Sequence, residues 1–450
     1  MARKASLSGF PELLPQERLI ENHVLDTLRH TFELHGFSSI ETRSIETVQQ
    51  LLRKGEIDKE VYGISRLLDQ EDKQTAGKEK LALHFDLTVP FSRYVVENAG
   101  YLDFPFMRYQ IQKVWRGERP QEGRFREFTQ ADVDVVGQGS LPFHYDVELA
   151  LVVVAALSNL DIGEFKLRVN NRKLSEGFYQ AIGLHDTAAV LRTIDKLEKI
   201  GSTAVAQLLI TELGATEKQA QLALDLAAIQ SSDTSFVAQV RQLGVSNELL
   251  EQGLKELEEV VSHAAAQAPG RICADLSIAR GLDYYTGTVY ETVLVGHEQL
   301  GSICSGGRYE SLASKGKQTF PGVGLSIGVT RLVSRIVGQG LAQASRKVPS
   351  VVFIALAHDE MWGAAQDLAR QLRQRDIACE VSATAAKFGK QIKHAEKRGI
   401  PFVWFIQEDD RGNLSHEVKD IRSGQQQAVT PQSWFPPEED LKVSIQALKS

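Results

Sequence analysis

The feature that most constrains the fold of this sequence is a pair of segments with alternating polar and apolar residues, 108–116 and 125–136. A period of two is typical of β-strands. The stretch between them is polar, has glycines at positions 117 and 123, and contains Pro120. The pattern therefore predicts an antiparallel hairpin with a long loop, and any fold proposed for this part of the chain has to contain it.

Polar side chains gather on one face of each predicted strand, because successive side chains point to opposite sides of a strand. The residues on these faces are Gln130, Asp132 and Asp134 on the return strand and Arg108, Gln110, Gln112 and Arg116 on the first strand. Such a face is most often the solvent-facing side of an antiparallel sheet, and composition alone favours that interpretation.

The loop of the hairpin favours a functional interpretation instead. Four arginines lie within eleven residues, at positions 116, 119, 124 and 126. Guanidinium groups can bind phosphate through two parallel hydrogen bonds, so a cluster of them suits a phosphate-bearing ligand.

Two glycine-containing segments are further candidates for ligand binding. Residues 280–291 join an arginine to two adjacent tyrosines, which could orient a small polar ligand or simply pack. In residues 322–332 the glycines follow a GxGxxxG spacing, which does not match the GxGxxG of a dinucleotide-binding fold. Arg331 follows early in a predicted helix, so this segment could hold a nucleotide, or its glycines could serve helix–sheet packing.

Composition also divides the chain. Residues 185–268 are rich in Ala, Leu, Gln and Glu, which predicts a helical insert within a domain at 1–340. Residues 350–450 alternate apolar strand segments with helical ones, which predicts an α/β domain with a largely parallel sheet. Within it, a helix at 385–398 carries lysines along one face, either as a solvated surface or as one that faces RNA.

Several classes of protein are disfavoured. Hydrophobic residues make up 42% and charged residues 24% of the 450, so the chain is neither disordered nor collagen-like. The three cysteines are far apart and no histidine cluster accompanies them, which disfavours a disulfide framework and a structural zinc site. The first residues do not predict a secretory signal, and the longest apolar run, 149–157, is too short to span a bilayer. We expect a soluble, cytoplasmic protein with no membrane association; its net charge of −7 does not exclude an RNA enzyme.

In this order, the segments resemble the histidyl-tRNA synthetases, a family of class II aminoacyl-tRNA synthetases, from end to end. Residues 114–128 resemble class II motif 2, residues 280–291 resemble the histidine-specific motif, and residues 322–332 resemble motif 3. Residues 83–90 occupy the place of the segment that contacts the amino acid, and residues 418–424 resemble part of the anticodon-binding domain. The resemblance implies an α+β catalytic domain with a six-stranded antiparallel class II sheet, a helical insertion, and a C-terminal α/β anticodon-binding domain.

The resemblance also implies a role for each candidate site residue. Those expected to bind histidine are Asp86, Thr88 and Gln130 at the α-ammonium group, Leu87 in the same segment, and Asp134, Tyr284 and Tyr285 around the imidazole nitrogens. The catalytic residues are expected to be Arg280 and Arg116, which meet the substrate carboxylate and the α-phosphate of ATP. Arg116 and Arg331 are expected to bind ATP, with Arg331 at the γ-phosphate. Arg124 and Arg126, in the loop, are expected to bind ATP or the acceptor stem of the tRNA.

The implied activity is that of a histidine–tRNA ligase, which forms histidyl-adenylate and pyrophosphate and then transfers histidine to the 3′-terminal adenosine of tRNA(His). It implies Mg²⁺ with ATP, no tightly bound prosthetic group, no metal ion held by the protein itself, and a homodimer. The alternatives are inactive relatives: a regulatory subunit of ATP phosphoribosyltransferase, or a sensor of amino acid or RNA. Those regulatory subunits usually lack the C-terminal domain and the arginine of the specific motif, whereas this chain has residues 350–450 and Arg280.

Four positions depart from the family pattern. Arg43 stands where motif 1 usually has a proline, and His84 stands where an arginine is usual beside Asp86. Thr330 replaces the common acidic residue before the motif 3 arginine, and Glu310 replaces a common aspartate. None of these changes removes a residue that is expected to contact substrate.

Overall fold

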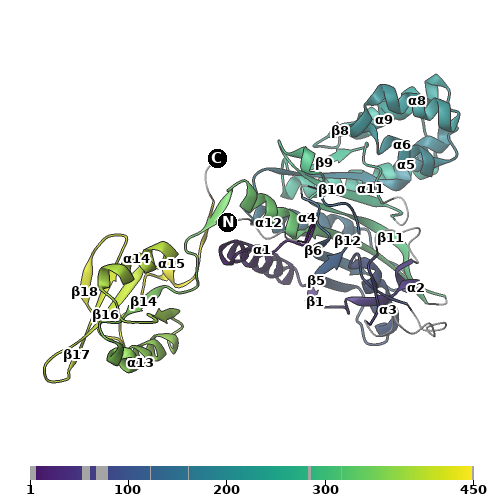
Figure 1. Cartoon of the computed structure of the whole chain (residues 1–450). Coiled ribbons are helices and arrows are strands. Elements are labelled where there is room, and N and C mark those ends of the chain that lie inside the picture. Colours follow the sequence, from purple (N-terminus) through teal and green to yellow (C-terminus); the bar gives the residue numbers. More distant parts are fainter. Residues whose placement is uncertain are drawn as a thin grey trace. The chain divides into compact units, whose positions relative to one another are not determined.

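The computed structural model describes residues 7–52, 61–66, 80–121, 123–160, 162–281, 285–315 and 317–447. These residues form two compact units (Figure 1). Unit 1 contains the described residues up to Pro11 together with Val24–Ser334, and unit 2 contains Glu12–His23 together with those from Arg335 onward. Near the N-terminus, residues with apolar side chains at helical spacing form helix α1 (Pro15–Leu34).

Unit 1 is built on one large sheet. Among the described residues its strand order is β1-β5-β6-β12-β11-β10-β7-β9-β8. Six neighbouring strands form a continuous antiparallel series: β5 (Phe106–Trp115), β6 (Glu127–Val136), β12 (Gln318–Gly328), β11 (Cys304–Lys315), β10 (Thr288–Leu294) and β7 (Phe165–Asn171). The flanking strands are β1 (Ser38–Ser39), β9 (Ile272–Asp275) and β8 (Gln230–Ser231). The antiparallel class II sheet is therefore confirmed.

Strands β5 and β6 form the predicted hairpin. Their register pairs the polar residues with one another: Arg108 with Asp134, Gln110 with Asp132, and Gln112 with Gln130. This face is not solvent-facing, so that interpretation of it was wrong: Arg108 is 0% and Asp134 3% exposed. Helix α3 (Thr88–Asn98) covers it, with the Phe91 ring 3.9 Å from the Arg108 guanidinium. The Gln110 amide donates a hydrogen bond to Thr42 Oγ1 at 2.9 Å. Periodicity reports which residues share a face but not what covers that face.

Helices pack against the sheet and against one another. Helix α4 (His144–Ser158) contacts β6 and β12 and contains the apolar run 149–157, most of which is buried. No helix in the described ranges is long and apolar enough to cross a membrane. The range predicted to be helical contains α6 (Thr187–Ile194), α7 (Leu197–Ile200), α8 (Ser202–Leu213), α9 (Glu217–Ala227), α10 (Phe236–Gln242) and α11 (Glu248–Gln267). Helix α11 packs on α4 and on α5 (Arg172–Ala181), which joins these helices to the sheet.

The smaller elements of unit 1 lie near the start of α3 and after β12. A small sheet is formed by β2 (Ile45–Thr47), β4 (Leu81–Leu83) and β3 (Gly63–Ile64), with α2 (Val48–Leu51) beside it. Helix α12 (Val329–Gly338) follows β12 directly.

Unit 2 contains a mixed sheet of strand order β15-β14-β16-β17-β18. Its strands are β14 (Val352–Ala355), β15 (Cys379–Val381), β16 (Phe402–Glu408), β17 (Leu414–Asp420) and β18 (Gln426–Ala428). The first three pair in parallel, as predicted, whereas β17 and β18 are antiparallel, so the sheet is less parallel than expected. Most residues of β17 and β18 are exposed or half-buried, and they lack the apolar signal that marks the buried strands.

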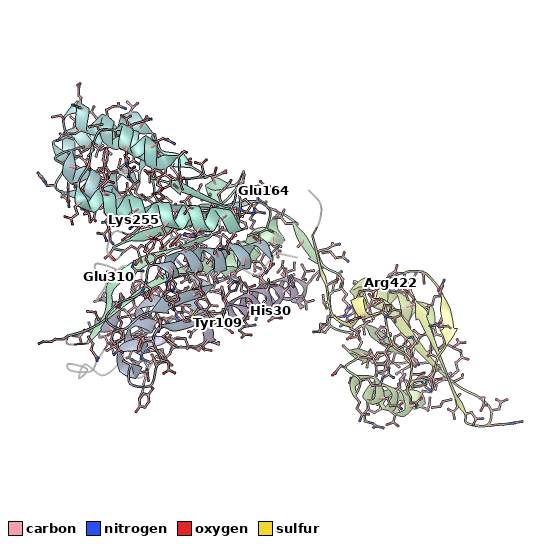
Figure 2. The ribbon with its side chains drawn as sticks, turned by 180° about the vertical axis from the view of Figure 1, so that it is seen from behind. His30, Tyr109, Glu164, Lys255, Glu310 and Arg422 are labelled. Atoms are coloured by element: carbon pink, nitrogen blue, oxygen red, sulfur yellow. The ribbon has the colours of Figure 1, made fainter. Side chains whose placement is uncertain are left out.

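The helices of unit 2 are α13 (Trp362–Arg373), α14 (Phe388–Arg398) and α15 (Glu438–Leu441), and β13 (Ala342–Ala344) pairs with β19 (Ile445–Ala447). Arg422, labelled in Figure 2, pairs with Asp420 of β17 at 3.1 Å and with Asp440 of α15 at 2.8 Å. These ion pairs tie the C-terminal helix to the sheet.

A buried ion pair in unit 1 gives a test of the fold. Asp146 Oδ2 lies 2.6 Å from Arg308 Nη1, and Asp146 is fully buried. We predict that Asp146→Ala lowers the free energy of unfolding by about 3–5 kcal/mol, because the buried Arg308 guanidinium loses its buried counter-charge and keeps only the exposed Glu310 at 3.4 Å. Urea titrations followed by circular dichroism would measure this loss. As a control, Asp367→Ala, in an exposed pair with Arg370, should cost less than about 1 kcal/mol. Equal losses for the two variants would contradict the prediction.

Candidate functional site

A cavity of about 250 Å³ lies at the antiparallel sheet of unit 1. Its wall is formed by the hairpin loop, the beginning of β11, the end of β12 and the beginning of α12. The charged residues that line it are Arg116, Arg124, Arg280, Arg331 and Glu118, and the polar ones include Gln130, Ser302, Ser305 and Ser326. Four guanidinium groups around one cavity make a site for a ligand with several negative charges.

Arg331 is held at this cavity from two sides. It lies in the first turn of α12, where its Nε donates to the Gly123 carbonyl at 2.9 Å and its Nη1 donates to the Ser302 carbonyl. Gly123 has a φ of 69°, a conformation that favours glycine. Burial lowers the pKa of Arg331, and the charges of the other cavity arginines, at positions 124, 116 and 280, lower it further. An anion in the cavity would relieve this repulsion.

Arg116 joins the hairpin to the segment at 84–88. Its Nε donates to the Phe85 carbonyl at 2.9 Å, and its guanidinium lies 5.0 Å from the Phe128 ring. Asp86 caps the following helix, because its Oδ1 accepts from the Val89 N–H at 3.0 Å. Leu87 and Thr88 form the start of α3, with Leu87 fully buried.

His84 supplies two more hydrogen bonds to the same junction. Its Nε2 lies 2.7 Å from the Lys113 carbonyl, to which it can only donate, and its own carbonyl accepts from the Trp115 N–H at 3.1 Å. Burial lowers the pKa of His84, against the opposing effects of the hydrogen bond and of the charges on Asp86 and Glu46. The lowered pKa favours the neutral ring at neutral pH, and in that form the bond to the Lys113 carbonyl places the proton on Nε2.

On the polar face of the hairpin, Asp134 lies opposite Arg108, near the start of β5. Its Oδ2 lies 2.6 Å from Arg108 Nη2, and its Oδ1 accepts from the Tyr309 hydroxyl at 3.2 Å. Gly324 stands opposite, where a Cβ atom would lie 1.9 Å from Oδ1. This position therefore has room only for glycine. Arg108 and Tyr309 were not among the candidate residues; counting the hairpin register from the sequence would have placed Arg108 opposite Asp134.

Between Asp134 and the cavity lies a hydrogen-bonded chain. Gln130 Nε2 donates to Ser326 Oγ at 2.6 Å, and the Ser326 hydroxyl donates to Asp132 Oδ1. Burial raises the pKa of Asp132 to about 7, although the charge of Arg108 acts in the opposite direction. Gln130 Oε1 is buried, and no residue in the described ranges hydrogen-bonds to it. A buried amide acceptor at a cavity wall suits a cationic donor such as an ammonium group.

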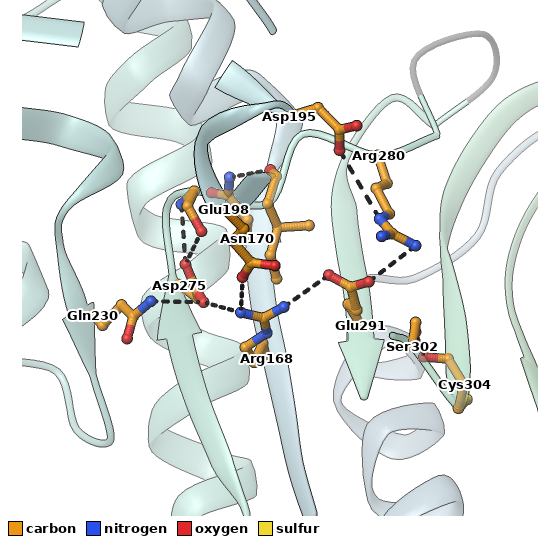
Figure 3. A network of polar contacts seen from close by, with 12 residues as sticks. Arg168, Asn170, Asp195, Glu198, Gln230, Asp275, Arg280, Glu291, Ser302 and Cys304 are labelled. Carbon is orange, nitrogen blue, oxygen red and sulfur yellow. Dashed lines mark hydrogen bonds and ion pairs between the residues drawn. The ribbon is translucent and has the colours of Figure 1, made fainter. Parts of the chain in front are cut away.

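Arg280 closes another side of the cavity. Its Nη1 lies 3.1 Å from Glu291 Oε1 (Figure 3). Gly281 follows with a φ of 70°, and a Cβ there would lie 1.8 Å from the Tyr285 ring, so the close approach requires glycine. Glu291 was not singled out from the sequence, although it ends the segment that was.

The cavity brings together only part of the candidate set. Arg116, Arg124, Gln130, Arg280 and Arg331 line it. The remaining described candidates are not among its lining residues: Asp86, Leu87, Thr88, Arg126, Asp134 and Tyr285. Tyr284 lies outside the described residues.

Arg126 acts within the hairpin loop. Its Nε donates to the Glu118 carbonyl at 3.2 Å and its backbone N–H donates to the Gly9 carbonyl at 2.7 Å. These bonds hold the loop to the N-terminal segment.

The other departures from the family pattern find local partners. Thr330 Oγ1 accepts from the Thr129 N–H at 2.8 Å, and so joins α12 to β6. Arg43 lies 2.9 Å from Glu46, and Glu310, labelled in Figure 2, lies 3.4 Å from Arg308. No group of three or more His, Cys, Asp or Glu residues suited to a metal ion occurs in the described part of the chain.

Comparison with known proteins agrees with this geometry. The family model described as "Histidyl-tRNA synthetase" matches residues 9–332, and that described as "Anticodon binding domain" matches residues 350–435. A "Histidine--tRNA ligase" of Micrococcus luteus is 67% identical over 98% of this chain and 98% of its own, and one of Cutibacterium acnes is 56% identical over 99% of both.

A solved structure is also similar. The crystal structure of histidyl-tRNA synthetase from Nostoc sp. PCC 7120 matches with a TM-score of 0.83 and 37% identity, over 95% of this chain and 97% of that one. The sheet, the cavity and these matches define a class II aminoacyl-tRNA synthetase. Within that class, the chain belongs to the histidyl-tRNA synthetase family.

The neutral His84 gives a pH prediction. Because its pKa in the folded protein lies below the ordinary value of about 6.5, the unfolded chain binds more protons below that pH. The stability it contributes is present above about pH 6.5 and is lost as the pH falls. We predict that between pH 7 and 5.5 the wild type loses up to about 1 kcal/mol more unfolding free energy than His84→Gln, which keeps an N–H donor but does not titrate. Parallel urea titrations at both pH values would measure it; equal losses would contradict it.

Proposed function

We propose that this chain is a histidine–tRNA ligase. It would activate L-histidine with ATP to histidyl-adenylate and pyrophosphate, and then transfer histidine to the 3′-terminal adenosine of tRNA(His). The observation that carries the proposal is the cavity lined by four arginines on an antiparallel sheet, in a chain 67% identical over 98% of its length to a curated histidine–tRNA ligase.

We propose that different domains of the chain carry out catalysis and tRNA binding. We assign residues 1–340 to a catalytic domain, interrupted by a helical insertion domain at 185–268, and residues 350–450 to an α/β anticodon-binding domain. The match of residues 350–435 to an anticodon-binding model supports a contact with tRNA there. We further propose a homodimer that works in the cytoplasm.

The first step joins the histidine carboxylate to the α-phosphorus of ATP, and the bond from that phosphorus to the β-phosphate bridging oxygen breaks. Arg116 and Arg280 would neutralise the charge that develops there, Arg331 would hold the γ-phosphate end, and Arg124 and Arg126 would contact ATP or the acceptor stem. The bond from Arg331 to the Gly123 carbonyl supports this by fixing one guanidinium before ATP binds. Catalysis would rest on positioning and charge neutralisation.

Mg²⁺ would enter with ATP, since divalent cations bind phosphate oxygens with few protein ligands. Glu118, which lines the cavity, lies 3.8 Å from Arg124, so its carboxylate would face the ATP-bound ion without being assigned as its ligand. The ion would neutralise phosphate charge.

Histidine would lie beside the ATP site. Gln130, with its buried Oε1, would accept from the α-ammonium group together with Asp86 and Thr88, next to Leu87. Asp134, with Tyr285 and Tyr284, would bind the imidazole, which donates from one nitrogen and accepts at the other. The ion pair to Arg108 supports this assignment, because it fixes the orientation of the Asp134 carboxylate on the buried face.

In the second step a terminal ribose hydroxyl of the tRNA attacks the activated carbonyl carbon, and AMP leaves. Among the described residues that line the cavity, no side chain is an evident general base for this hydroxyl. We propose that a phosphate oxygen of the adenylate takes the proton.

The first test is histidine-dependent ATP–pyrophosphate exchange on the purified chain. We expect exchange with histidine and with no other amino acid, and its loss in Arg280→Ala, because the charge at the α-phosphate would no longer be neutralised. Histidine binding without exchange in the wild type would instead indicate a regulatory subunit or a sensor.

A second test concerns amino-acid recognition. Asp134→Ala should remove about 2–4 kcal/mol of transition-state binding for histidine, measured as kcat/KM for exchange, while KM for ATP changes little. Asp134→Asn, which keeps the shape of the side chain and should preserve the fold better, is the matched variant. Unchanged kcat/KM for histidine in both variants would remove the role assigned to Asp134.

A further inference from the structure

A network of carboxylates and guanidinium groups extends from helices α6 and α7 to Arg280. Figure 3 shows Glu291 between Arg280 and Arg168, with Asp195 on the far side of Arg280. None of the acidic residues of this network has a role in the reaction as derived above.

Glu291 is the centre of this network. It lies on β10, opposite Arg168 of β7 and Ser305 of β11, and Ser305 lines the cavity. The side chain is buried, with the residue 4% exposed. Its two oxygens are divided: Oε1 lies 3.1 Å from Arg280 Nη1, and Oε2 lies 3.1 Å from Arg168 Nη2. Burial raises the pKa of Glu291, although both arginines act in the opposite direction.

Arg168 anchors Glu291 to the sheet. Its Nη1 lies 3.2 Å from Asp275 Oδ2 and 2.7 Å from Glu198 Oε1. Asp275 is itself buried and accepts from Gln230 Nε2 at 3.0 Å. Because four strands, β7, β8, β9 and β10, contribute to this arrangement, Glu291 has a fixed place from which to hold Arg280.

Arg280 is less constrained on its other side. Its side chain is 46% exposed, and its Nε lies 3.9 Å from Oδ1 of Asp195, the residue directly after α6. Both arginines that pair with Glu291 therefore also pair with an acidic residue of the helical region. Asp195, after α6, pairs with Arg280, and Glu198, on α7, pairs with Arg168. An incoming phosphate can compete with the half-exposed Asp195 but cannot easily replace the buried Glu291.

We propose that Glu291 is the positioning residue that holds Arg280 at the cavity, and that Asp195 and Glu198 make this hold depend on the position of helices α6 and α7. The inference rests on the proposed function, since Arg280 is taken to act on the α-phosphate. A ligand that moves these helices would change the charge around Arg280 without touching the cavity.

The first experiment compares Glu291→Gln with the wild type in histidine-dependent pyrophosphate exchange. We expect kcat to fall by roughly ten- to a hundredfold, the size associated with a hydrogen bond to a charged group, with a smaller change in KM for ATP. Glu291→Asp, which keeps the charge, should recover part of kcat. The acidic limb of the pH profile of kcat should shift in Glu291→Gln, because the amide does not titrate. The charged residues that remain around this position are Arg168, Arg280, Asp275, Asp195 and Glu198.

The second experiment uses the exposed end of the network, where a substitution leaves the buried core of the sheet intact. Asp195→Asn should lower kcat by about two- to fivefold, as expected for a half-exposed ion pair, and should lower KM for ATP because a negative charge is removed. In an Arg280→Lys background, which lacks the guanidinium Nε, the same substitution should have no effect on kcat. Glu251→Gln, which removes a carboxylate paired with Arg241 at 3.6 Å outside this network, is the matched control.

The outcomes separate the two proposals. Absence of exchange in the wild type would overturn the proposed function. Exchange in the wild type with an unchanged kcat and pH profile in Glu291→Gln would overturn the positioning role alone. An equal effect of Asp195→Asn in the wild-type and Arg280→Lys backgrounds, or an equal effect of the Glu251→Gln control, would overturn the link to α6 and α7.

Discussion

The buried ion pair between Arg108 and Asp134 is the interaction on which the rest of unit 1 depends. Two charges on adjacent strands are stable out of water only when they face each other and their remaining hydrogen-bonding groups are satisfied. The β5–β6 register provides the first condition at 2.6 Å. The second is met only in part: Arg108 Nη1 donates to Gln110 Oε1 at 3.4 Å, while its Nε has no hydrogen-bond partner among the described residues. The Phe91 ring of α3 lies against this guanidinium, and Thr42 accepts from Gln110. A slip of one residue in the register would turn these side chains into the apolar side of the sheet.

The covering of this face also arranges the cavity. The segment that leads into α3 is bonded to the end of β5 through His84 and through Arg116, so the chain that covers the polar face also holds one of the cavity arginines. Arg331 arrives from the other direction on α12 and is held by Gly123 of the hairpin loop. Both arginines are thus fixed by backbone carbonyls before any anion binds. Such preorganisation is what phosphoryl-group chemistry requires, because little rearrangement remains when charge develops.

Much of this arrangement could be predicted from the sequence. The hairpin, its polar face and its arginine-rich loop follow from period-two alternation, and the helices from composition and from signals such as the capping box at Thr216. The family could be recognised because its motifs keep their order along the chain. The burial of Arg108 could not be predicted, because a polar strand looks the same in sequence whether or not another segment covers it. The antiparallel strands β17 and β18 could not be predicted because they lack the apolar signal of buried strands.

The sequence by itself therefore determined local structure, strand faces and the residue types available for phosphate binding. Only the tertiary structure decided which of them meet. Arg168, Asp195 and Glu291 are far apart along the chain, and their charges converge around Arg280 because β7 and β10 pair in one register while α6 ends beside them. The physical reason is that periodicity is a property of neighbours in sequence, whereas burial, pKa and ion pairing depend on which distant segments exclude water from the same place.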